Sequence, residues 1–479
     1  MLVFLWWAWA GLSALVNIFH ELWFEDIVVV DKYQSQITDK LQEKWIKVVI
    51  WDGAYDFQKD DIIFYSDAVV NSQDFQKVQD NIKFTYFQFL WEISKRFQTI
   101  AIAGTHGKTS TTAMILTVAK NIWFENLWLW IVGGFVPDLK NNNFYVNQNK
   151  KEDIKKIFEK LLTAKWDRPV KLFKEMSFIV EADEFNKHFL LLDPSISLIT
   201  KVDHDHKDVY PTLEDYLATF KEFINKTKKE VFTNDEEFTK NIWKIDKKIK
   251  YVWINPNIKF KYMFWEHMEK NASLVVKLFK ILGFEEQKII KILNNFKWIW
   301  RRQEFLWVID NWKLKIENWN KELNTNYPLS IINSQLNKIS IYTDYAHHPT
   351  EIKATVDAFK QNFPEEEIIW VFQPHQLFRF VSYEKDFISS LNKFDKIYIY
   401  DIYSVREDKL IKQLIKEKNL DVKNNQEAIQ QIWTQIAQKL NWKYIDNFNK
   451  LINSIEAENW IVVIMTAWDL DYEIRNYLK

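Results

Sequence analysis

The glycine-bearing stretch Gly104-Thr105-His106-Gly107-Lys108-Thr109-Ser110 constrains the fold of this chain more than any other feature. The apolar, β-branched residues at 97–100 suit a buried strand, and the apolar spacing over 113–120 suits a helix. A strand, a glycine turn, Lys-Thr and a helix form the arrangement of a phosphate-binding loop, where backbone N–H groups meet an anion. We therefore expect Lys108 to reach the β- and γ-phosphates of a nucleotide and the Thr109 hydroxyl to bind Mg²⁺.

This loop departs from the commonest phosphate-loop pattern at one position. The pattern G-x-x-x-x-G-K-[ST] has glycine where this chain has Ile102. A plain turn between a strand and a helix is the alternative. The flanking strand and helix favour the phosphate-binding loop.

Length and charge bound the class of protein. A chain of 479 residues is longer than a domain with a single hydrophobic core usually is, so three domains are expected. The net charge of −1 provides no overall basic field to recruit nucleic acid. The absence of cysteine excludes disulfides, thiolate metal sites and a cysteine nucleophile, and fits a cytosolic protein.

The numbers of tryptophan and glycine are abnormal. The chain has 24 Trp and only 7 Gly, and the two together come close to the usual glycine share of about 7%. The chain is also rich in Lys, Asn and Ile. We hypothesise that many of these tryptophans are UGA codons that the source organism reads as glycine. The alternative is a truly Trp-rich protein.

Residues 1–19 are almost entirely apolar and allow two interpretations. One is a membrane helix or signal anchor. The other is a buried strand at 2–5, a turn at 6–11 and a helix at 12–19. If Trp6 and Trp9 are read as glycine, that turn, which ends at Gly11, becomes a glycine-rich nucleotide turn.

Further strands are expected at 27–30, 46–50 and 62–65, and together with residues 1–19 they make a first domain at 1–97. The first of these strands ends at Asp31, about 20 residues after the turn, where nucleotide-binding units place a ribose ligand. A capping or solvent-facing role for Asp31 is equally open. The strand at 62–65 ends at Ser66.

The second domain, expected at 98–303, places acidic residues and histidines after two strands. A strand at 176–180 ends in Glu181-Ala182-Asp183-Glu184, and a strand at 196–200 leads into Asp203-His204-Asp205-His206. Beside a phosphate loop, these strand ends predict a Mg²⁺ site, whereas solvated acidic loops are the alternative. A helix is expected at 152–162.

Two further features lie near the end of this second domain. A helix at 267–282 brings His267 and Asn271, four residues apart, to one face. Arg301-Arg302 follow Trp298-Ile299-Trp300, which would be a flexible hinge with glycine at both Trp positions. The arginines are either an exposed charge cluster or anion ligands at a domain junction.

The third domain, expected at 304–479, has four strands that each end in a polar loop. Its strands are expected at 339–342, 368–372, 397–400 and 461–465. Polar loops at the same end of every strand predict a parallel sheet with a ligand crevice at that end.

Taken together, these motifs resemble the Mur ligase family over nearly the whole chain. The motifs are A-G-T-H-G-K-T at 103–109, E-A-D-E at 181–184 with Phe189-Leu190 and Pro194 following, D-H at 205–206, R-R at 301–302, D-Y-A-H-H-P-T-E at 344–351, F-Q-P-H at 372–375 and I-Y-x-x-R-E at 402–407. The resemblance implies an α/β fold of three domains: an N-terminal Rossmann-like UDP-binding domain, a central P-loop ATPase-like domain and a C-terminal Rossmann-like domain that binds an amino acid.

The resemblance also bears on the tryptophans, because several of them fall where the family has glycine. These positions are Trp6, Trp9, Trp91, Trp265, Trp298, Trp300 and Trp468. Scattered genuine tryptophans would not select turn positions, so the resemblance favours miscoding.

The activity that the resemblance implies is an ATP-dependent, ADP-forming ligation in peptidoglycan precursor synthesis. L-Alanine would be joined to the lactyl carboxylate of UDP-N-acetylmuramate through an acyl phosphate, with ATP and Mg²⁺ as cofactors. The resemblance implies a cytoplasmic enzyme with no nucleic-acid or membrane partner, and it leaves the oligomeric state open.

The resemblance assigns roles residue by residue. Lys108, Glu181 and His206 would be catalytic, and Thr109, Glu181 and His206 would hold metal. The ATP ligands would be Gly104, Thr105, His106, Gly107, Lys108, Thr109, Ser110, His267, Asn271, Arg302 and Asp344. The UDP part would meet Gly11, Ser13, Asp31 and Ser66. The amino acid would meet Tyr345, His348, His375 and Arg379, the last through its carboxylate.

Three residues depart from the family pattern. Gln376 stands where relatives often carry Arg, Lys201 stands where a small or amide residue is usual, and Thr466 replaces the first glycine of a G-A-G-D loop. Three rival interpretations stay open. These are a murein-peptide recycling ligase, a nucleotide-binding regulatory module without ligase activity, and a membrane-anchored protein.

Overall fold

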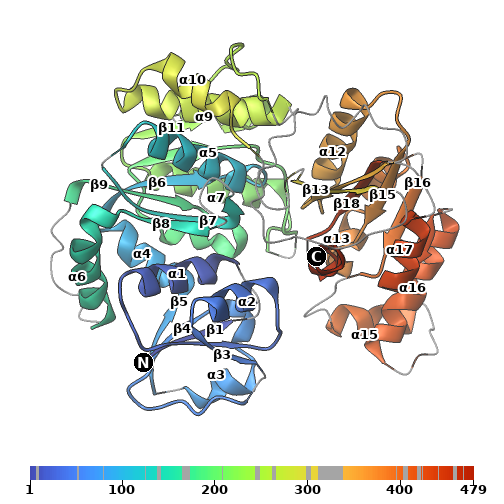
Figure 1. Ribbon diagram of the computed structural model, residues 1–479, viewed down its shortest axis with the longest axis horizontal. Coiled ribbons are helices and arrows are strands. Elements are labelled where there is room, and N and C mark those ends of the chain that lie inside the picture. The colour runs from blue at the N-terminus through green and yellow to red at the C-terminus, as the bar shows by residue number, and fades with distance from the viewer. Residues whose placement is uncertain are drawn as a thin grey trace. The chain divides into compact units, whose positions relative to one another are not determined.

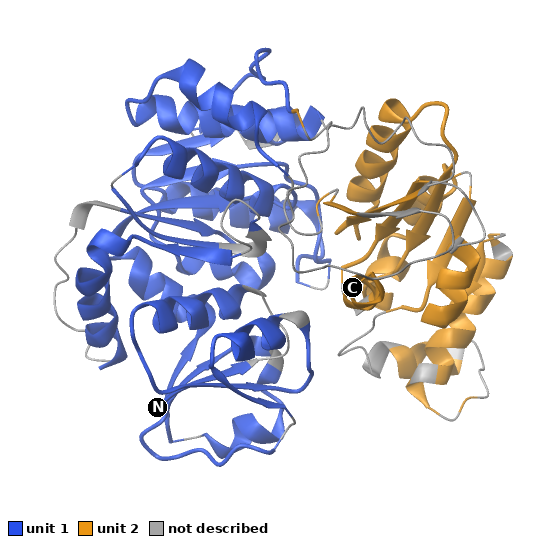
Figure 2. Ribbon diagram, in the orientation of Figure 1, with its two compact units in different colours: residues 1–260, 266–297 blue, residues 261–265, 298–479 orange. Residues whose placement is uncertain are grey.

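The computed structural model describes residues 1–479 apart from 7–9, 51–52, 79, 125, 137–141, 164–172, 208, 243–248, 262–265, 298–301, 303, 311–337, 395, 403–407, 418–421, 423, 441, 457–460, 468 and 479. Its elements form three sheets flanked by helices, which confirms the α/β class (Figure 1). The chain divides into two compact units (Figure 2). Unit 1 comprises Met1–Phe260 and Glu266–Lys297, and unit 2 comprises Lys261–Trp265 and Trp298–Lys479. The domain boundaries at 97 and 303 stay a prediction.

The first sheet of unit 1 has the order β3-β2-β1-β4-β5, and all its strands are parallel. Its strands are β1 (Leu2–Trp6), β2 (Ile27–Asp31), β3 (Lys47–Ile50), β4 (Ile62–Tyr65) and β5 (Ile82–Thr85). Its helices are α1 (Ala10–Glu21), α2 (Gln36–Glu43), η1 (Asp67–Val69), α3 (Gln73–Lys77) and α4 (Tyr86–Ser94). The strand predicted at 2–5 and the helix predicted at 12–19 are therefore confirmed, whereas residues 7–9 of the predicted turn lie outside the described residues. No helix of the described residues is long and apolar enough to cross a membrane.

Aromatic packing explains why this first sheet is buried. Phe4 of β1 stacks on Phe64 of β4 with ring centroids 4.7 Å apart, and Phe19 of α1 lies 5.2 Å from Phe64. Buried phenylalanines each remove a large apolar surface from water. The apolar residues at 2–5 in β1 and at 27–30 in β2 are therefore buried on both faces, as parallel strands between helices require.

The second sheet of unit 1 has the order β12-β11-β10-β6-β9-β7-β8. Its strands are β6 (Phe97–Ala103), β7 (Leu127–Val136), β8 (Asn142–Val146), β9 (Phe173–Glu181), β10 (Ile196–Ile199), β11 (Glu230–Thr233) and β12 (Ile249–Tyr251). Its helices are α5 (Lys108–Asn121), η3 (Gln148–Lys150), α6 (Lys151–Leu162), η4 (Phe185–Leu191), α7 (Leu213–Lys226), α8 (Glu236–Ile242), α9 (Glu266–Ile281) and α10 (Glu286–Asn294). Strand β6 lies between β9 and β10 and is parallel to both, so the loop after it starts at the centre of the sheet.

Helix α1 connects the two sheets of unit 1. It packs on β7 and β8 of the second sheet as well as on its own strand β1 (Figure 1). The Asn143 amide donates to Ser13 Oγ over 3.0 Å, and Lys44 Nζ donates to Asn17 Oδ1 over 2.6 Å. Polar side chains buried between the sheets thus find partners there.

Unit 2 contains the third sheet, with the order β13-β14-β18-β15-β16-β17. Its strands are β13 (Glu304–Asp310), β14 (Lys338–Asp344), β15 (Ile368–Phe372), β16 (Lys396–Tyr400), β17 (Lys443–Ile445) and β18 (Ile461–Met465). Its helices are α12 (Pro349–Asn362), α13 (Leu377–Ser382), α14 (Glu384–Leu391), α15 (Asp408–Glu417), α16 (Asn425–Lys439), α17 (Phe448–Glu456) and α18 (Asp469–Tyr477). Strands β14, β18, β15 and β16 are neighbours and parallel, which confirms the sheet predicted for the four strands with polar ends.

Five of the seven tryptophans that coincide with family glycines lie outside the described residues, as does Arg301. These five are Trp9, Trp265, Trp298, Trp300 and Trp468. Trp6 is the last residue of β1. Trp91 lies in α4, half-buried, with the Lys95 ammonium 3.7 Å from its ring centroid.

Candidate functional site

The loop between β6 and α5 depends on two glycines. Gly104 has φ +133° and Gly107 has φ +85°, conformations that L side chains rarely adopt. A Cβ atom at Gly104 would collide with Thr200 Oγ1, and one at Gly107 would lie 2.6 Å from Asn271 Nδ2. Both positions therefore require glycine. The second contact also brings the predicted ATP ligand Asn271, which is buried in α9, to the loop.

Lys108, the first residue of α5, lies within hydrogen-bond distance of four oxygens. Its Nζ is 2.6 Å from Gly104 O, 3.4 Å from Thr105 O, 2.8 Å from Glu184 Oε2 and 3.0 Å from Glu184 Oε1. Burial lowers the pKa of Lys108, but the carboxylates of Glu184, Asp183 and Glu181 outweigh burial and raise it above the ordinary value. Lys108 is therefore a fixed cation at the phosphate loop.

The acidic turn at 181–184 follows β9, which lies beside β6, and Glu181 pairs with Ile102 in the sheet register. Burial raises the pKa of Glu184 against the opposing effect of Lys108. At Asp183 burial also raises the pKa, but His188, Lys108 and His206 lower it further, and the balance lies below the ordinary value. The end of β9 thus brings three carboxylates close to one ammonium group.

His206 reaches the same cluster from the loop after β10. Its Nε2 lies 3.9 Å from Glu184 Oε1 and 3.8 Å from Asp205 Oδ2. Its backbone has φ +53°, an uncommon conformation for a non-glycine residue. Glu184 thus lies beside both Lys108 and His206. The site prediction missed Glu184, although the second glutamate of E-A-D-E could have indicated it.

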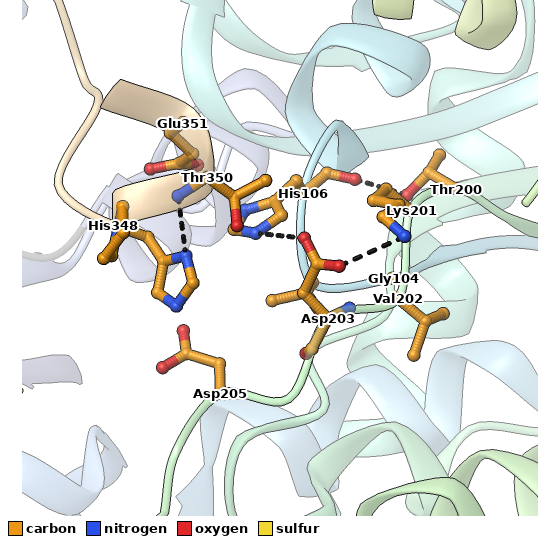
Figure 3. A network of polar contacts seen from close by, with 12 residues as sticks. Gly104, His106, Thr200, Lys201, Val202, Asp203, Asp205, His348, Thr350 and Glu351 are labelled. Carbon is orange, nitrogen blue, oxygen red and sulfur yellow. Dashed lines mark hydrogen bonds and ion pairs between the residues drawn. The ribbon is translucent and has the colours of Figure 1, made fainter. Parts of the chain in front are cut away.

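A second polar network holds the loop after β10 against the phosphate loop (Figure 3). Lys201 O accepts from the backbone N–H groups of Thr105 and His106 over 2.8 and 3.3 Å. Asp203 lies between His106 and Lys201, with His106 Nε2 at 3.2 Å and Lys201 Nζ at 3.2 Å. Burial raises the pKa of Asp203, but these two partners outweigh burial and lower it to about 2.

Lys201, which departs from the family pattern, also pairs with carboxylates of the next loop. Its Nζ lies 3.5 Å from Asp235 Oδ2 and 3.6 Å from Glu237 Oε2. The lysine is therefore neutralised by three acidic residues and adds no net positive charge to the loop.

The donors near the loop suit a small hard cation only if a bound substrate completes the set. Among the described residues no three His, Asp or Glu side chains are placed so that they could hold a metal together. The predicted ligands Thr109, Glu181 and His206 offer one hydroxyl, one carboxylate and one imidazole. Mg²⁺ usually takes one or two carboxylates and fills its other positions with phosphate oxygens and water, so the donor chemistry fits.

The residues predicted for the UDP part gather at the first sheet. Asp31 is buried at the end of β2 and accepts from Tyr33 N–H over 3.1 Å. Ser13 contacts Asn143 of the second sheet, and Gly11 is buried in α1. Ser66 follows β4, and its buried hydroxyl has no hydrogen-bond partner among the described residues.

In unit 2 the predicted ATP ligands lie near the end of β14. The Arg302 guanidinium lies 4.7 Å from the Tyr345 ring centroid, and its Nη1 is 3.8 Å from Glu351 Oε1. Asp344 accepts from Ala346 N–H over 2.8 Å and is buried. Glu351, which the site prediction missed, orients Arg302.

The residues predicted for the amino acid come from two loops of unit 2. Arg379 Nη1 lies 3.2 Å from His375 Nδ1, and Arg379 is buried in α13. His348 caps α12 by accepting from Thr350 N–H over 3.4 Å (Figure 3). Gln376, where relatives often carry Arg, has φ +68° and begins α13.

Comparison with known proteins gives two family matches. Residues 102–294 match the Mur ligase middle domain, and residues 329–459 match the family described as Mur ligase, glutamate ligase domain. Together the two matches take in about two thirds of the chain. The chain belongs to the Mur ligase family. The resemblance found from the sequence motifs is thereby confirmed.

Individual relatives of this Mur ligase are distant but extend over most of the chain. A UDP-N-acetylmuramate–L-alanine ligase of Leuconostoc mesenteroides is 27% identical over 413 residues, which cover 83% of each chain. A ligase of the same name from Streptococcus mutans is 24% identical and covers 98% of this chain and 93% of its own.

Solved structures of the family share its fold. The UDP-N-acetylmuramate–alanine ligase MurC of Thermotoga maritima gives a TM-score of 0.67 at 18% identity and covers 100% of this chain and 98% of its own. A murein peptide ligase of Psychrobacter arcticus gives 0.64 at 15% identity, with the same coverage. At such low identity the likeness shows the Mur ligase fold alone.

Proposed function

We propose that this Mur ligase joins L-alanine to the lactyl carboxylate of UDP-N-acetylmuramate at the expense of ATP, and so supplies a peptidoglycan precursor. The observation that carries the proposal is the set of relatives named UDP-N-acetylmuramate–L-alanine ligase, one of which covers 98% of this chain. A ligase that consumes ATP and a UDP-sugar works where these nucleotides are made, so we expect it in the cytoplasm.

The chemistry requires two anions to approach one another. A lactyl carboxylate oxygen bonds to the γ-phosphorus while the bond to ADP breaks, and the amine of L-alanine then attacks the acyl carbon and expels phosphate. Lys108, a cation beside the backbone N–H groups of the phosphate loop, neutralises the phosphates. Glu184 supports the role of Lys108 because its carboxylate accepts from the ammonium over 2.8 Å and so orients it.

The chain also provides groups for a divalent cation. Thr109, Glu181 and His206 would hold Mg²⁺, which supplies charge neutralisation between carboxylate and phosphate when bound. In unit 2, Arg379 and its neighbour His375 would pair with the carboxylate of the amino acid, since a guanidinium binds a carboxylate through two hydrogen bonds.

The test is ADP release by the purified full chain. We expect release only when UDP-N-acetylmuramate and L-alanine are both present, together with a product of the ligated mass. ADP release that does not depend on either UDP-N-acetylmuramate or L-alanine would instead indicate a regulatory ATPase and overturn the proposal.

A murein-peptide ligase is the second candidate, since a solved enzyme of that kind shares the fold over the whole chain. The residues after E-A-D-E, Phe185-Asn186-Lys187-His188-Phe189-Leu190, resemble those of the alanine ligases more than those of the murein-peptide ligases. Ligation assays with L-alanine and with the tripeptide L-alanyl-γ-D-glutamyl-diaminopimelate separate the two activities by their products.

A further inference from the structure

His188 joins carboxylates from two different sheets of unit 1. It lies in η4, directly after the acidic turn at 181–184. Its Nε2 is 2.9 Å from Asp67 Oδ2, and its Nδ1 is 3.9 Å from Asp183 Oδ2. Asp67 follows β4 of the first sheet, and Asp183 follows β9 of the second. The imidazole therefore bridges the ends of strands that belong to separate sheets.

The orientation of the ring is fixed by its surroundings. Phe87 of α4 stacks on it with centroids 3.8 Å apart and planes 16° apart, and the side chain is only 13% exposed. The preceding residues Asn186 and Lys187 have φ of +48° and +60°, so the backbone adopts an unfavourable conformation to present His188 here. Burial lowers the pKa of His188, but Asp183 and Asp67 outweigh burial and raise it to about 9. The bridge is therefore an imidazolium between two carboxylates at neutral pH.

Each turn that His188 joins also carries a predicted site residue. Ser66, next to Asp67, is a predicted ligand of the UDP-sugar and has a buried hydroxyl without a partner among the described residues. Glu181 and Glu184 flank Asp183 and lie beside Lys108. If these residues bind as predicted, the spacing between the two turns would set how the sugar nucleotide lies relative to the phosphate loop.

We propose that His188 is a positioning residue that ties the turn at Ser66-Asp67 to the acidic turn at 181–184 and thereby orients the UDP-sugar for phosphoryl transfer. The proposal rests on the function proposed above. His188 acts through Asp67 and Asp183. This role requires a positively charged side chain, which need not be an imidazole.

The test compares His188→Gln, which removes the cation, with His188→Lys, which restores one. Loss of a charge-assisted hydrogen bond predicts a roughly tenfold higher KM for UDP-N-acetylmuramate in His188→Gln, with the KM for ATP nearly unchanged. His188→Lys should recover most of this loss. His20→Gln, at the exposed end of α1, is the matched control and should behave as the parent.

Two results would overturn the proposal. One is an unchanged KM for the sugar nucleotide in His188→Gln, and the other is an equal rise for both substrates in His188→Gln and His188→Lys alike. If the parent protein has no ligase activity, the proposed function fails, and hydrogen exchange in the full chain decides the positioning role. Faster exchange of the amides at 66–70 in His188→Gln, reversed in His188→Lys, supports it, and equal exchange in all three proteins rejects it.

Three tryptophans of unit 1 occupy a backbone position that glycine prefers. Trp23 (φ +61°), Trp45 (φ +64°) and Trp123 (φ +56°) each follow the end of a helix, namely α1, α2 and α5. Gly283 (φ +92°) has the same place after α9. A bulky residue with positive φ is a genuine outlier, and three in one chain at the same kind of position require a common cause.

The hydrogen bonds at these four helix ends are alike. Gly283 N–H donates to Lys280 O over 3.1 Å and the next N–H, of Phe284, to Phe279 O over 3.0 Å. The equivalent pairs of bonds are 3.0 and 3.1 Å at Trp23, 2.9 and 3.1 Å at Trp45, and 3.3 and 2.9 Å at Trp123. Paired bonds of this kind define the Schellman motif, whose left-handed residue is usually glycine.

The indole rings at these three sites are largely exposed, so packing in the core does not explain why tryptophan should stand there. Trp45 is 96% exposed and Trp123 is 84% exposed, and Trp23, over whose ring the Lys151 ammonium lies at 3.9 Å, is still 56% exposed. We infer that residues 23, 45 and 123 are glycine in the protein that the native cell makes, because a UGA codon is translated there as glycine. These positions are independent of those at which family motifs place glycine.

Peptide mass spectrometry of the protein purified from its native host tests the assignment. Peptides that contain positions 23, 45 and 123 should have the mass of glycine at each. Tryptophan masses at these three positions would overturn it. In recombinant protein that carries tryptophan, Trp123→Gly should raise the Tm, whereas Trp130→Gly, which removes a buried ring whose Nε1 donates to Thr112 O over 3.0 Å, should lower it.

Discussion

The ammonium of Lys108 lies 2.8 Å from Oε2 of Glu184, although the two residues are 76 positions apart in the chain. The same carboxylate has its other oxygen 3.9 Å from His206 Nε2. Glu184 therefore lies beside two of the three residues to which the resemblance assigned catalysis. A buried carboxylate with this arrangement keeps the cation of the phosphate loop oriented before any nucleotide binds.

Lys108→Met should abolish most of the ligase activity. The substitution keeps the length of the side chain but removes the charge that faces the phosphates, and loss of one such stabilising group lowers kcat by about 10²–10³. Steady-state ADP release measures the effect. Lys120→Met, at the exposed end of the same helix α5, is the control and should keep nearly full activity. Activity of Lys108→Met within threefold of the parent would show that Lys108 does not serve the phosphates.

Gly107→Ala should weaken both the fold and ATP binding, whereas Gly283→Ala should weaken only the fold. Both glycines have positive φ, so alanine costs about 1–2 kcal/mol of backbone strain at either position. Only at Gly107 would the new Cβ meet another group, Asn271 Nδ2 at 2.6 Å, since nothing lies within 4 Å of the Cβ position at Gly283.

Thermal unfolding and the KM for ATP distinguish the two glycine effects. A higher KM in Gly107→Ala with an unchanged KM in Gly283→Ala is the expected pair of results. Equal KM values in both variants would mean that the fit of the phosphate loop against α9 has no part in nucleotide binding.

Asp203 should contribute stability that disappears in acid. His106 and Lys201 lower its pKa from 3.8 to about 2, so the ionised carboxylate stabilises the fold above pH 4. This contribution, about 2 kcal/mol, is lost as the pH falls through 2. Calorimetric unfolding of the parent and Asp203→Asn should therefore differ most near neutral pH and converge toward pH 2.

Asp60→Asn, on an exposed turn, is the control for the Asp203 experiment. Its unfolding temperature should follow that of the parent at every pH. A constant difference between Asp203→Asn and the parent from pH 7 to pH 2 would show that the stabilisation does not depend on ionisation.

The sequence alone predicted the first and last residues of those strands whose apolar runs end abruptly. The predicted ranges 62–65, 368–372 and 461–465 are the ranges of β4, β15 and β18, because each run is bounded by polar or turn residues. Helix α5 was predicted only from 113, yet it begins at Lys108. Its first turns are polar, and the hydroxyls of Thr111 and Thr112 bond back to carbonyls four residues earlier, which apolar periodicity does not reveal.

Side-chain partners across the fold were harder to predict than strand ends. The resemblance assigned Ser13 to the UDP part, and nothing in the sequence indicated the bond that its hydroxyl accepts from Asn143, 130 residues away. The bridge from Asp67 to His188 spans 121 residues and depends on the stacking of Phe87. Such contacts follow from how the two sheets pack, and a pattern within one segment contains no information on that packing.

Arg379→Lys should raise the KM for L-alanine without a comparable change in the KM for ATP or UDP-N-acetylmuramate. Lysine keeps the charge of the buried Arg379 but loses the planar fork that binds a carboxylate through two hydrogen bonds, so an increase of about 10- to 100-fold is expected. Initial rates at varied L-alanine measure it. Lys385→Gln, on the exposed face of the neighbouring helix α14, is the control and should leave all three KM values unchanged. If Arg379→Lys instead raised the KM for ATP alone, Arg379 would belong to the nucleotide and the amino-acid carboxylate would need another partner.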